Sequence, residues 1–465
     1  MSTLLVRNPH RKYNTYMKVE PRTLKGFRDF LPKEARKRQY VIDTLKRVFE
    51  SYGFEPLETP ALEYEDILLG KYGDEGDKLL YNFIDKGDRK VALRYDQTVP
   101  LARVVSQYMN SLPMPFKRYQ MQNVWRAENT QKGRFREFLQ CDADIVGIKS
   151  RTADVEIISV ALDGLMALGF DKPKLKLNDR RVYDLLVKAV ASLNKNQKLI
   201  DDLSKFNQTV NELAMSVDKL NKIGEENVLF NIQNNAFLKE NLFTQNLADL
   251  KLLTDFLSLK EVTNPNRLSE LLSPYLNDED KSTLSLIVEL IETVQTNSVI
   301  FSPTLARGLD YYTELIFEVE IDGYSGGSVA GGGRYDNLVS TFSNLPLPAA
   351  GFAFGFDRLM EAMDLLNKFP EEFITTKVLI TIPNSELALV AFTTAQSLRI
   401  KKINTEVYLD EEASMEKQFK YAEKKGIPNV VVPLNENEVE LRTKNEDGSI
   451  NKETLTLEQL IEKLQ

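Results

Sequence analysis

Arginine and tyrosine residues gather just before a β-prone segment in the last third of the chain. The stretch "LARGLDYYTELIFEVE", residues 305–320, alternates in its second half and predicts a strand. Arg307, Tyr311 and Tyr312 stand immediately before that alternating part. A strand that only packs a core does not need such a cluster at its mouth, so this cluster marks a candidate ligand site.

A second group of cations surrounds a polar loop between two β-prone runs, in "VWRAENTQKGRFREFLQCDADIVG", residues 124–147. Arg126 and Arg134 suit phosphate oxygens because a guanidinium binds two oxygens at once and stays charged. Phe138 lies four residues beyond Arg134, where its ring could stack on a nucleobase. A solvated hairpin tip is the alternative, which the carboxylates and Gln140 of the following run make less favourable.

Two glycine-rich stretches follow. "GYSGGSVAGGGRYDNL", residues 323–338, is either a flexible hairpin or a backbone brought close to a ligand, with Arg334 and Asp336 behind it. "AAGFAFGFDRLMEAMDLL", residues 349–366, runs into a helix with Arg358 in its first turn. A helix start favours an anion, so an arginine there suggests a bound triphosphate. The alternative for this stretch is a tightly packed core strand.

A polar strand end offers the opposite charge. In "ALRYDQTVPLARV", residues 92–104, the pattern predicts Arg94, Asp96 and Thr98 on one face of a strand that runs into a helix. Asp96 and Thr98 could receive an ammonium group. Read alone, the segment is equally a solvent-facing strand edge.

Composition removes several kinds of chemistry. The 465 residues carry a net charge of −8, which excludes nucleic-acid binding through bulk positive charge and leaves only a local surface. A single cysteine, Cys141, excludes an intrachain disulfide and a zinc cage, and a single histidine, His10, excludes a histidine triad. No apolar run is long enough to predict a membrane span.

Several predicted segments must position these residues. Helical spacing predicts helices at 33–52 and 151–169, and β-prone runs predict strands at 90–95, 116–125 and in "FLQCDADIVG". A basic N-terminal extension covers 1–19; an organellar presequence is its alternative. A leucine- and lysine-rich region with helical periodicity covers 175–298, and after a linker at 368–376 a βαβα order predicts a small α/β domain with a partly parallel sheet.

The motifs together resemble a known family. "LETPALE", "WRAEN…RFREFLQCD" and "GFAFGFDR" are similar, in order and spacing, to the three motifs of class II aminoacyl-tRNA synthetases. "RGLDYYT" with "GGGRYD" resembles the histidine-specific elements of histidyl-tRNA synthetases. The resemblance covers nearly all of residues 20–465. It implies an α+β fold: an antiparallel-sheet catalytic core at 20–174 and 299–367, a helical insertion domain at 175–298, and an α/β anticodon-binding domain at 376–465.

The same resemblance implies roles at the histidine end of the site. Arg307 would hold the substrate carboxylate and the α-phosphate. Tyr311 and Tyr312 would lie against the histidine, with Tyr312 reaching the imidazole and Asp144 on its far side. The remaining polar contacts, including those to the ammonium group, would come from Asp96, Thr98 and Gln140.

At the ATP end, the resemblance assigns five residues. Arg126 would contact the α-phosphate as a second catalytic arginine, and Glu128 would lie on the adenine side. Arg134 would contact the outer phosphates, Phe138 would stack on the base, and Arg358 matches the arginine of the third motif. Mg²⁺ would accompany ATP, with no metal ligands assigned.

The implied function is ATP-dependent activation of L-histidine and its transfer to the 3′ end of tRNA(His), by a cytoplasmic homodimer with no membrane association. Three alternatives share the core: a catalytically silent, histidine-binding regulatory paralogue, the synthetase-like sensor region of a stress kinase, and another class IIa synthetase. The "RGLDYY" element and the C-terminal domain argue against the regulatory paralogue. The phosphate arginines, with no kinase sequence beside them, argue against the sensor region, and the "RGLDYY" element argues against another class IIa synthetase.

Overall fold

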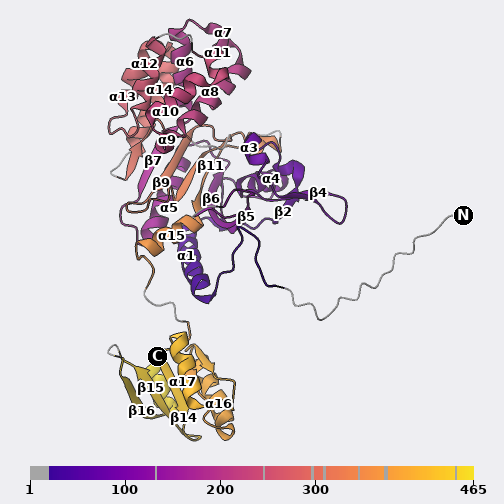
Figure 1. The fold of residues 1–465 in the computed structure, drawn as a ribbon, viewed down its shortest axis with the longest axis vertical. Coiled ribbons are helices and arrows are strands. Elements are labelled where there is room, and N and C mark those ends of the chain that lie inside the picture. The colour runs from indigo at the N-terminus through magenta and orange to yellow at the C-terminus, as the bar shows by residue number, and fades with distance from the viewer. Residues whose placement is uncertain are drawn as a thin grey trace, which may run out of the picture. The chain divides into compact units, whose positions relative to one another are not determined.

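The computed structural model describes residues 20–130, 133–243, 247–294, 298–306, 311–343, 346–370, 375–445 and 448–465. The predicted extension at 1–19 lies outside these residues. The chain divides into two compact units, Met1–Phe369 and Pro370–Gln465 (Figure 1). The division falls within the segment that the sequence predicts as a linker.

A largely antiparallel sheet of eight strands forms the centre of the first unit, which confirms the predicted fold class. The strand order is β1-β5-β6-β11-β10-β9-β7-β8, and β1/β5 and β7/β8 are its parallel pairs. The strands are β1 Glu55–Pro56, β5 Phe116–Trp125, β6 Glu137–Val146, β7 Lys174–Asp179, β8 Val299–Phe301, β9 Leu315–Glu320, β10 Ala330–Arg334 and β11 Ala349–Gly355.

Three helices pack on one face of this sheet: α1 Pro32–Ser51, α5 Thr152–Ala167 and α15 Phe356–Leu365. Leu45 and Phe49 of α1 are fully buried in the same apolar cluster as Phe352 and Phe354 of β11. The Phe49 and Phe354 rings stack with centroids 6.4 Å apart. These helices fill the core side of the sheet, so the other face is left for a cavity.

A small sheet, ordered β2-β4-β3, lies beside the large one and carries the polar segment predicted as a strand end. The strand stops earlier than predicted: β4 ends at Leu93 and the next helix begins at Thr98. Asp96 therefore lies in the turn, where its Oδ1 accepts a hydrogen bond from the backbone N–H of Val99, in the first turn of the helix, at 3.1 Å. The elements are β2 Leu62–Tyr64, α2 Glu65–Leu68, α3 Gly73–Asp77, β3 Asn82–Ile84, β4 Lys90–Leu93 and α4 Thr98–Tyr108.

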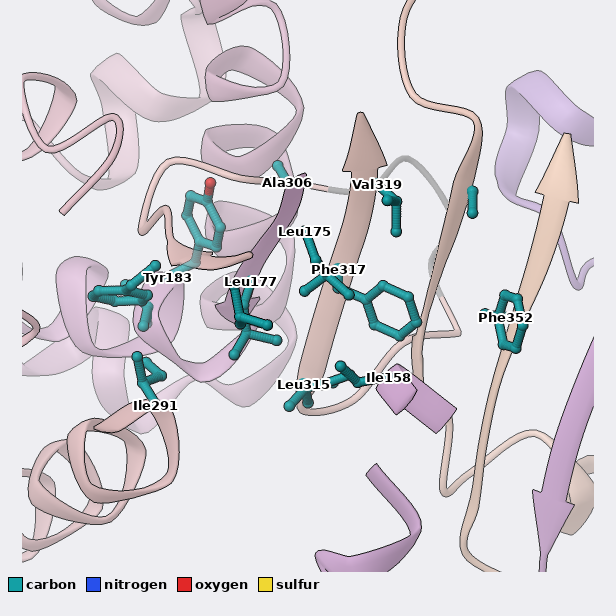
Figure 2. Packing of buried hydrophobic residues seen from close by; sticks show 14 of the residues in the cluster. Ile158, Leu175, Leu177, Tyr183, Ile291, Ala306, Leu315, Phe317, Val319 and Phe352 are labelled. Atoms are coloured by element: carbon teal, nitrogen blue, oxygen red, sulfur yellow. The ribbon is translucent and has the colours of Figure 1, made fainter. Parts of the chain in front are cut away.

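The helical region begins later than the sequence suggests. β7, Lys174–Asp179, pairs with β9 and β8 and so belongs to the large sheet, although the predicted insertion starts at 175. Figure 2 shows Leu175 and Leu177 of β7 packed between Tyr183 on the helical side and Phe317 of β9. The helices are α6 Arg181–Leu193, α7 Gln197–Asp201, α8 Leu203–Val217, α9 Leu220–Ile223, α10 Glu225–Asn234, α11 Ala236–Asn241, α12 Leu247–Leu257, α13 Asn266–Leu272 and α14 Asp278–Val294.

The second unit is the predicted α/β domain. Its five-stranded sheet has the order β13-β12-β14-β15-β16, with β12 parallel to both β13 and β14 and the remaining pairs antiparallel. In the described parts of both units, no helix is long and apolar enough to cross a bilayer. The elements are β12 Val378–Ile380, α16 Ala388–Ile400, β13 Thr405–Val407, α17 Met415–Lys425, β14 Asn429–Pro433, β15 Glu438–Lys444, β16 Ile450–Thr456 and α18 Leu457–Leu464.

Candidate active site

A cavity of about 970 Å³ opens on the face of the large sheet opposite α1 and α5. Every predicted site residue that the structure describes lines it, although these residues come from distant parts of the chain. Arg307 lies outside the described residues, so its predicted role stays a prediction. The residues brought together are Asp96, Thr98, Arg126, Glu128, Arg134, Phe138, Gln140, Asp144, Tyr311, Tyr312 and Arg358.

The strand β6 supplies the polar floor of this cavity. Side chains alternate between the two faces of a strand, so Leu139, Cys141, Ala143 and Ile145 enter the apolar cluster. The intervening residues, Gln140, Asp142 and Asp144, line the cavity and are nearly inaccessible to solvent. One face of β6 thus packs in the apolar core, and its other face lines the cavity with polar side chains.

Asp144 is held by two neighbours. Its Oδ2 lies 2.8 Å from Nη2 of Arg118, a fully buried side chain on β5, and its Oδ1 accepts a hydrogen bond from the hydroxyl of Tyr335. Burial still raises the pKa of Asp144 above its ordinary value, since the Arg118 charge offsets only part of the desolvation. The carboxyl group is therefore fixed in orientation and polarised.

Glycine at position 351 makes room for Asp144. A Cβ atom there would lie 1.9 Å from Asp144 Oδ1, far inside van der Waals contact. Gly333 of β10 likewise admits Tyr312, whose ring would be 2.9 Å from an added Cβ. Tyr312 is buried, and its ring centroid lies 4.9 Å from that of Tyr311.

Asp96 forms the second carboxylate of this end. Its Oδ1 accepts hydrogen bonds from the Tyr72 hydroxyl and from the Val99 backbone, both at 3.1 Å. Burial raises the pKa of the Asp96 carboxyl, against the lowering effect of these bonds and of Arg126. With Asp142 and Asp144, it makes this end of the cavity rich in buried acceptors.

The opposite end is cationic. The Arg126 guanidinium donates to the Tyr95 carbonyl at 3.1 Å and lies 5.2 Å from the centroid of the Phe138 ring. Arg134 lies 3.6 Å from the Glu128 carboxylate. Arg358 Nη1 donates to the Ser328 carbonyl at 3.0 Å, within the glycine-rich segment that forms the cavity wall.

Arg358 lacks full charge compensation in the described residues. Burial lowers its pKa, and the positive charge of Arg134 lowers it further. Two guanidinium groups that destabilise each other in a cavity are stabilised when a polyanion enters between them. This end of the cavity therefore suits a phosphate chain.

Arg28, which sequence reasoning missed, connects the N-terminal segment to this end. Its guanidinium lies 3.2 Å from the centroid of the Phe135 ring, and its Nη2 lies 2.8 Å from Asp357 Oδ2. Asp357 directly precedes Arg358 and also pairs with Arg38 of α1 at 3.1 Å. The arginine thus braces the loop that carries Arg134 against the start of α15.

Arg334, considered as a ligand contact from the sequence, points elsewhere. It is 1 % exposed, lies 2.8 Å from Asp154 of α5, and donates to the carbonyls of Ile148 and Ser150. Residues 325–331 of the same stretch do line the cavity. The glycine-rich segment therefore forms the wall, and its arginine joins β10 to α5.

Other polar groups of the site were also missed: Tyr72, Arg118, Asp142 and Tyr335. For Asp142 a signal was present, because it alternates with Gln140 and Asp144 in "FLQCDADIV" and must share their face. Tyr335 lies within the quoted "GGGRYD" element but was given no role, and Arg118 stands directly opposite Asp144 in the β5/β6 pair, so only the exact register of that pair would have revealed it.

Mg²⁺ can be held by one or two carboxylates together with phosphate oxygens. Glu128 and Glu318 both act electrostatically on Arg358 at the cationic end, so the donor set fits a metal ion carried by a nucleotide. In the described part of the chain, no group of three or more carboxylate, cysteine or histidine side chains is arranged to hold a metal by itself.

Comparison with known proteins identifies the class of this site. Residues 26–359 match the family described as "Histidyl-tRNA synthetase", and residues 377–465 match "Anticodon binding domain". An antiparallel sheet with this two-ended cavity, joined to a domain of the anticodon-binding type, defines an aminoacyl-tRNA synthetase.

Individual relatives indicate which amino acid this synthetase class member is similar in using. The Cytophaga hutchinsonii protein named "Histidine--tRNA ligase" is 38% identical over 88% of this chain and 91% of its own length, and the Bacteroides fragilis protein of the same name is 34% identical over 96% and 99%. The crystal structure of histidyl-tRNA synthetase from Nostoc sp. PCC 7120 superposes with a TM-score of 0.76 at 27% identity, covering 96% of this chain and 99% of the other. The chain belongs to the histidyl-tRNA synthetase family.

Proposed function

We propose that the protein activates L-histidine with ATP and transfers the histidyl group to the 3′ end of tRNA(His). The observation that best supports this function is a single cavity, with arginine side chains at one end and buried hydrogen-bond acceptors at the other. An amino acid bound with its ammonium at the acceptor end would direct its carboxylate toward the arginines. The α-phosphate of ATP would lie at the junction of the two ends.

The chemistry needs positioning and charge stabilisation more than a general base. The histidine carboxylate attacks the α-phosphorus and pyrophosphate leaves. Arg126 and Arg307 would stabilise charge on the α-phosphate, while Arg134 and Arg358 would hold the outer phosphates and Phe138 the base. Glu318, which lines the cavity near Arg358, and phosphate oxygens would hold Mg²⁺, which would supply charge neutralisation for the leaving group.

Selection of histidine would rest on two groups of opposite hydrogen-bonding character. Neutral imidazole carries one donor and one acceptor. The Tyr312 hydroxyl would meet one nitrogen, and Asp144, oriented by Arg118 and Tyr335, would meet the other. Such a pocket rejects apolar amino acids of similar size because they would leave its own groups unpaired.

The active protein would be a cytoplasmic homodimer. Its sequence motif "LETPALE" leads into the small sheet, where the register puts Leu62, Tyr64 and Phe83 on one face, and these side chains are 43%, 56% and 48% exposed. An apolar patch of this kind on a small sheet supports self-association. Sedimentation at micromolar concentration should therefore give a dimer, and Tyr64→Asp with Phe83→Asp should give a monomer. A wild-type monomer would contradict the proposal.

The proposed activity is tested by pyrophosphate–ATP exchange with each of the twenty amino acids, followed by charging of tRNA(His). Exchange should require histidine and no other amino acid. Histidine binding without exchange would instead indicate the silent regulatory paralogue. Exchange with glycine, proline or threonine would indicate another member of the same class.

A further inference from the structure

Besides Asp144 Oδ2, which is ion-paired with Arg118, three buried acceptor oxygens at the carboxylate end have no hydrogen-bond partner among the described residues. They are Asp96 Oδ2, Gln140 Oε1 and Asp142 Oδ1. All three residues line the same cavity, and the two aspartates are each at most 3 % exposed. An unpaired buried acceptor costs free energy, so three together indicate a ligand that donates hydrogen bonds.

Asp142 lies at the centre of this group. On the sheet it stands opposite Gln120 of β5 on one side and Ala353 of β11 on the other. Ala353 also lines the cavity, so a small side chain beside the carboxyl group leaves space for a ligand. Gln140 and Asp144 flank Asp142 on the same face of β6.

The neighbouring cations make their hydrogen bonds to groups other than Asp142, and Nε of Arg118 has no partner among the described residues. Arg118 directs Nη2 to Asp144 at 2.8 Å and Nη1 to the Gln120 side chain at 3.4 Å, and Arg126 donates to the Tyr95 carbonyl. Among the described residues, no ion pair joins Asp142 to either arginine. A buried carboxylate without a direct cation is costly, so a structural role alone does not account for Asp142.

We propose that Asp142 is a third acceptor for the α-ammonium group of the amino-acid substrate, acting together with Asp96 and Gln140. This inference rests on the proposed function and adds a residue that recognises the substrate. An ammonium group carries three N–H donors and no acceptor, which matches three acceptor oxygens around one point. Two aspartates also supply more negative charge than one, so they discriminate strongly against ligands without the ammonium.

The binding of this cation should release a proton. Burial raises the pKa of Asp142 well above its ordinary value, Asp144 and Asp96 raise it further, and Arg118 and Arg126 lower it. The neighbouring thiol of Cys141 is itself buried and its pKa is raised, so it adds no charge. An ammonium group beside Asp142 would oppose this rise in pKa, so protons held in the empty site would leave to solvent when the ammonium enters. Histidine affinity should rise with pH until the carboxyl is ionised without the ligand.

The test measures binding by calorimetry to the full chain, with histidine, histamine and deaminohistidine as ligands. Histamine keeps the ammonium and lacks the carboxylate, whereas deaminohistidine lacks the ammonium. Asp142→Asn keeps the shape and removes the charge. Glu137→Gln on the same strand is the matched control, because Glu137 does not line the cavity and contacts Asn123.

Asp142→Asn should weaken the binding of histidine and of histamine roughly 10- to 100-fold, as expected for the loss of a charged hydrogen bond. The affinity for deaminohistidine should not change. The substitution should also reduce the number of protons released, measured in buffers of different ionisation enthalpy. The inference would be overturned if the variant bound deaminohistidine as much more weakly as it binds histidine. It would also be overturned if both histidine affinity and the number of protons released on binding were unchanged. Wild-type protein that binds no histidine would overturn the proposed function itself.

Discussion

Arg307 is a single residue on which much of the proposed chemistry depends. Arg307→Ala should lower histidine-dependent exchange on the order of 10² to 10³-fold, because a fixed cation stabilises the charge that develops on the α-phosphate more than the ground state. Arg307→Lys should recover only part of this loss, since an ammonium cannot span two oxygens in one plane. The measurement is exchange turnover at saturating substrates.

Thermal unfolding and histidine binding of the same variants provide the control. If Arg307 acts on the substrates and not on the fold, its replacement should leave the midpoint of thermal unfolding nearly unchanged. If turnover stays within a few-fold of the wild type, or if the midpoint falls together with activity, Arg307 is not the catalytic cation.

At this scale, the sequence predicts what lies within continuous motifs. Arg126, Phe138 and Gln140 could be placed because the strand–loop–strand around them is local. Arg118 could not, because its contact with Asp144 depends on the exact register of that strand pair, and Tyr335 could not, because it is 191 residues away from Asp144. The role of a buried polar residue is decided by its neighbours across the sheet.

The pairing of β6 with β11 tolerates little change at position 351. Gly351→Ala should place a methyl group against the carboxylate of Asp144, which Arg118 and Tyr335 prevent from moving aside. Overpacking of this kind costs about 1 to 3 kcal/mol of unfolding free energy. We expect a lower thermal midpoint and weaker histidine binding, measured by calorimetry.

Gly355→Ala on the same strand is the control for stability. The nearest atom to its added Cβ would be the Val329 carbonyl oxygen at 3.6 Å, an ordinary contact. Equal midpoints for the two variants would mean that the close approach of Gly351 to Asp144 is not needed by the sheet.

Element boundaries were predicted well where capping or glycine marks them, and poorly where composition changes gradually. The predicted helix at 33–52 is observed as Pro32–Ser51. By contrast, β7 was assigned to the helical region because its lysines and leucines share the composition of the helices that follow. Only its pairing with β9 distinguishes it as a strand.

The whole molecule divides after Phe369, and this division predicts separable activities. A fragment of residues 1–369 contains every described residue of the cavity and should retain histidine-dependent pyrophosphate exchange. It should charge tRNA(His) poorly, because it lacks the domain of the anticodon-binding type. Circular dichroism would first establish that the fragment is folded. A folded fragment without exchange would show that the C-terminal unit contributes to activation.

The alternation along β6 also limits how the length of this chain can change. Removing one residue near Leu139 would turn each later side chain of the strand to the opposite face, sending Asp142 and Asp144 toward the apolar cluster and Ala143 toward the cavity. A deletion of a single codon here would therefore abolish substrate recognition and folding together. Insertions and deletions among descendants of this gene should collect in the connections between strands, and β6 should keep its length.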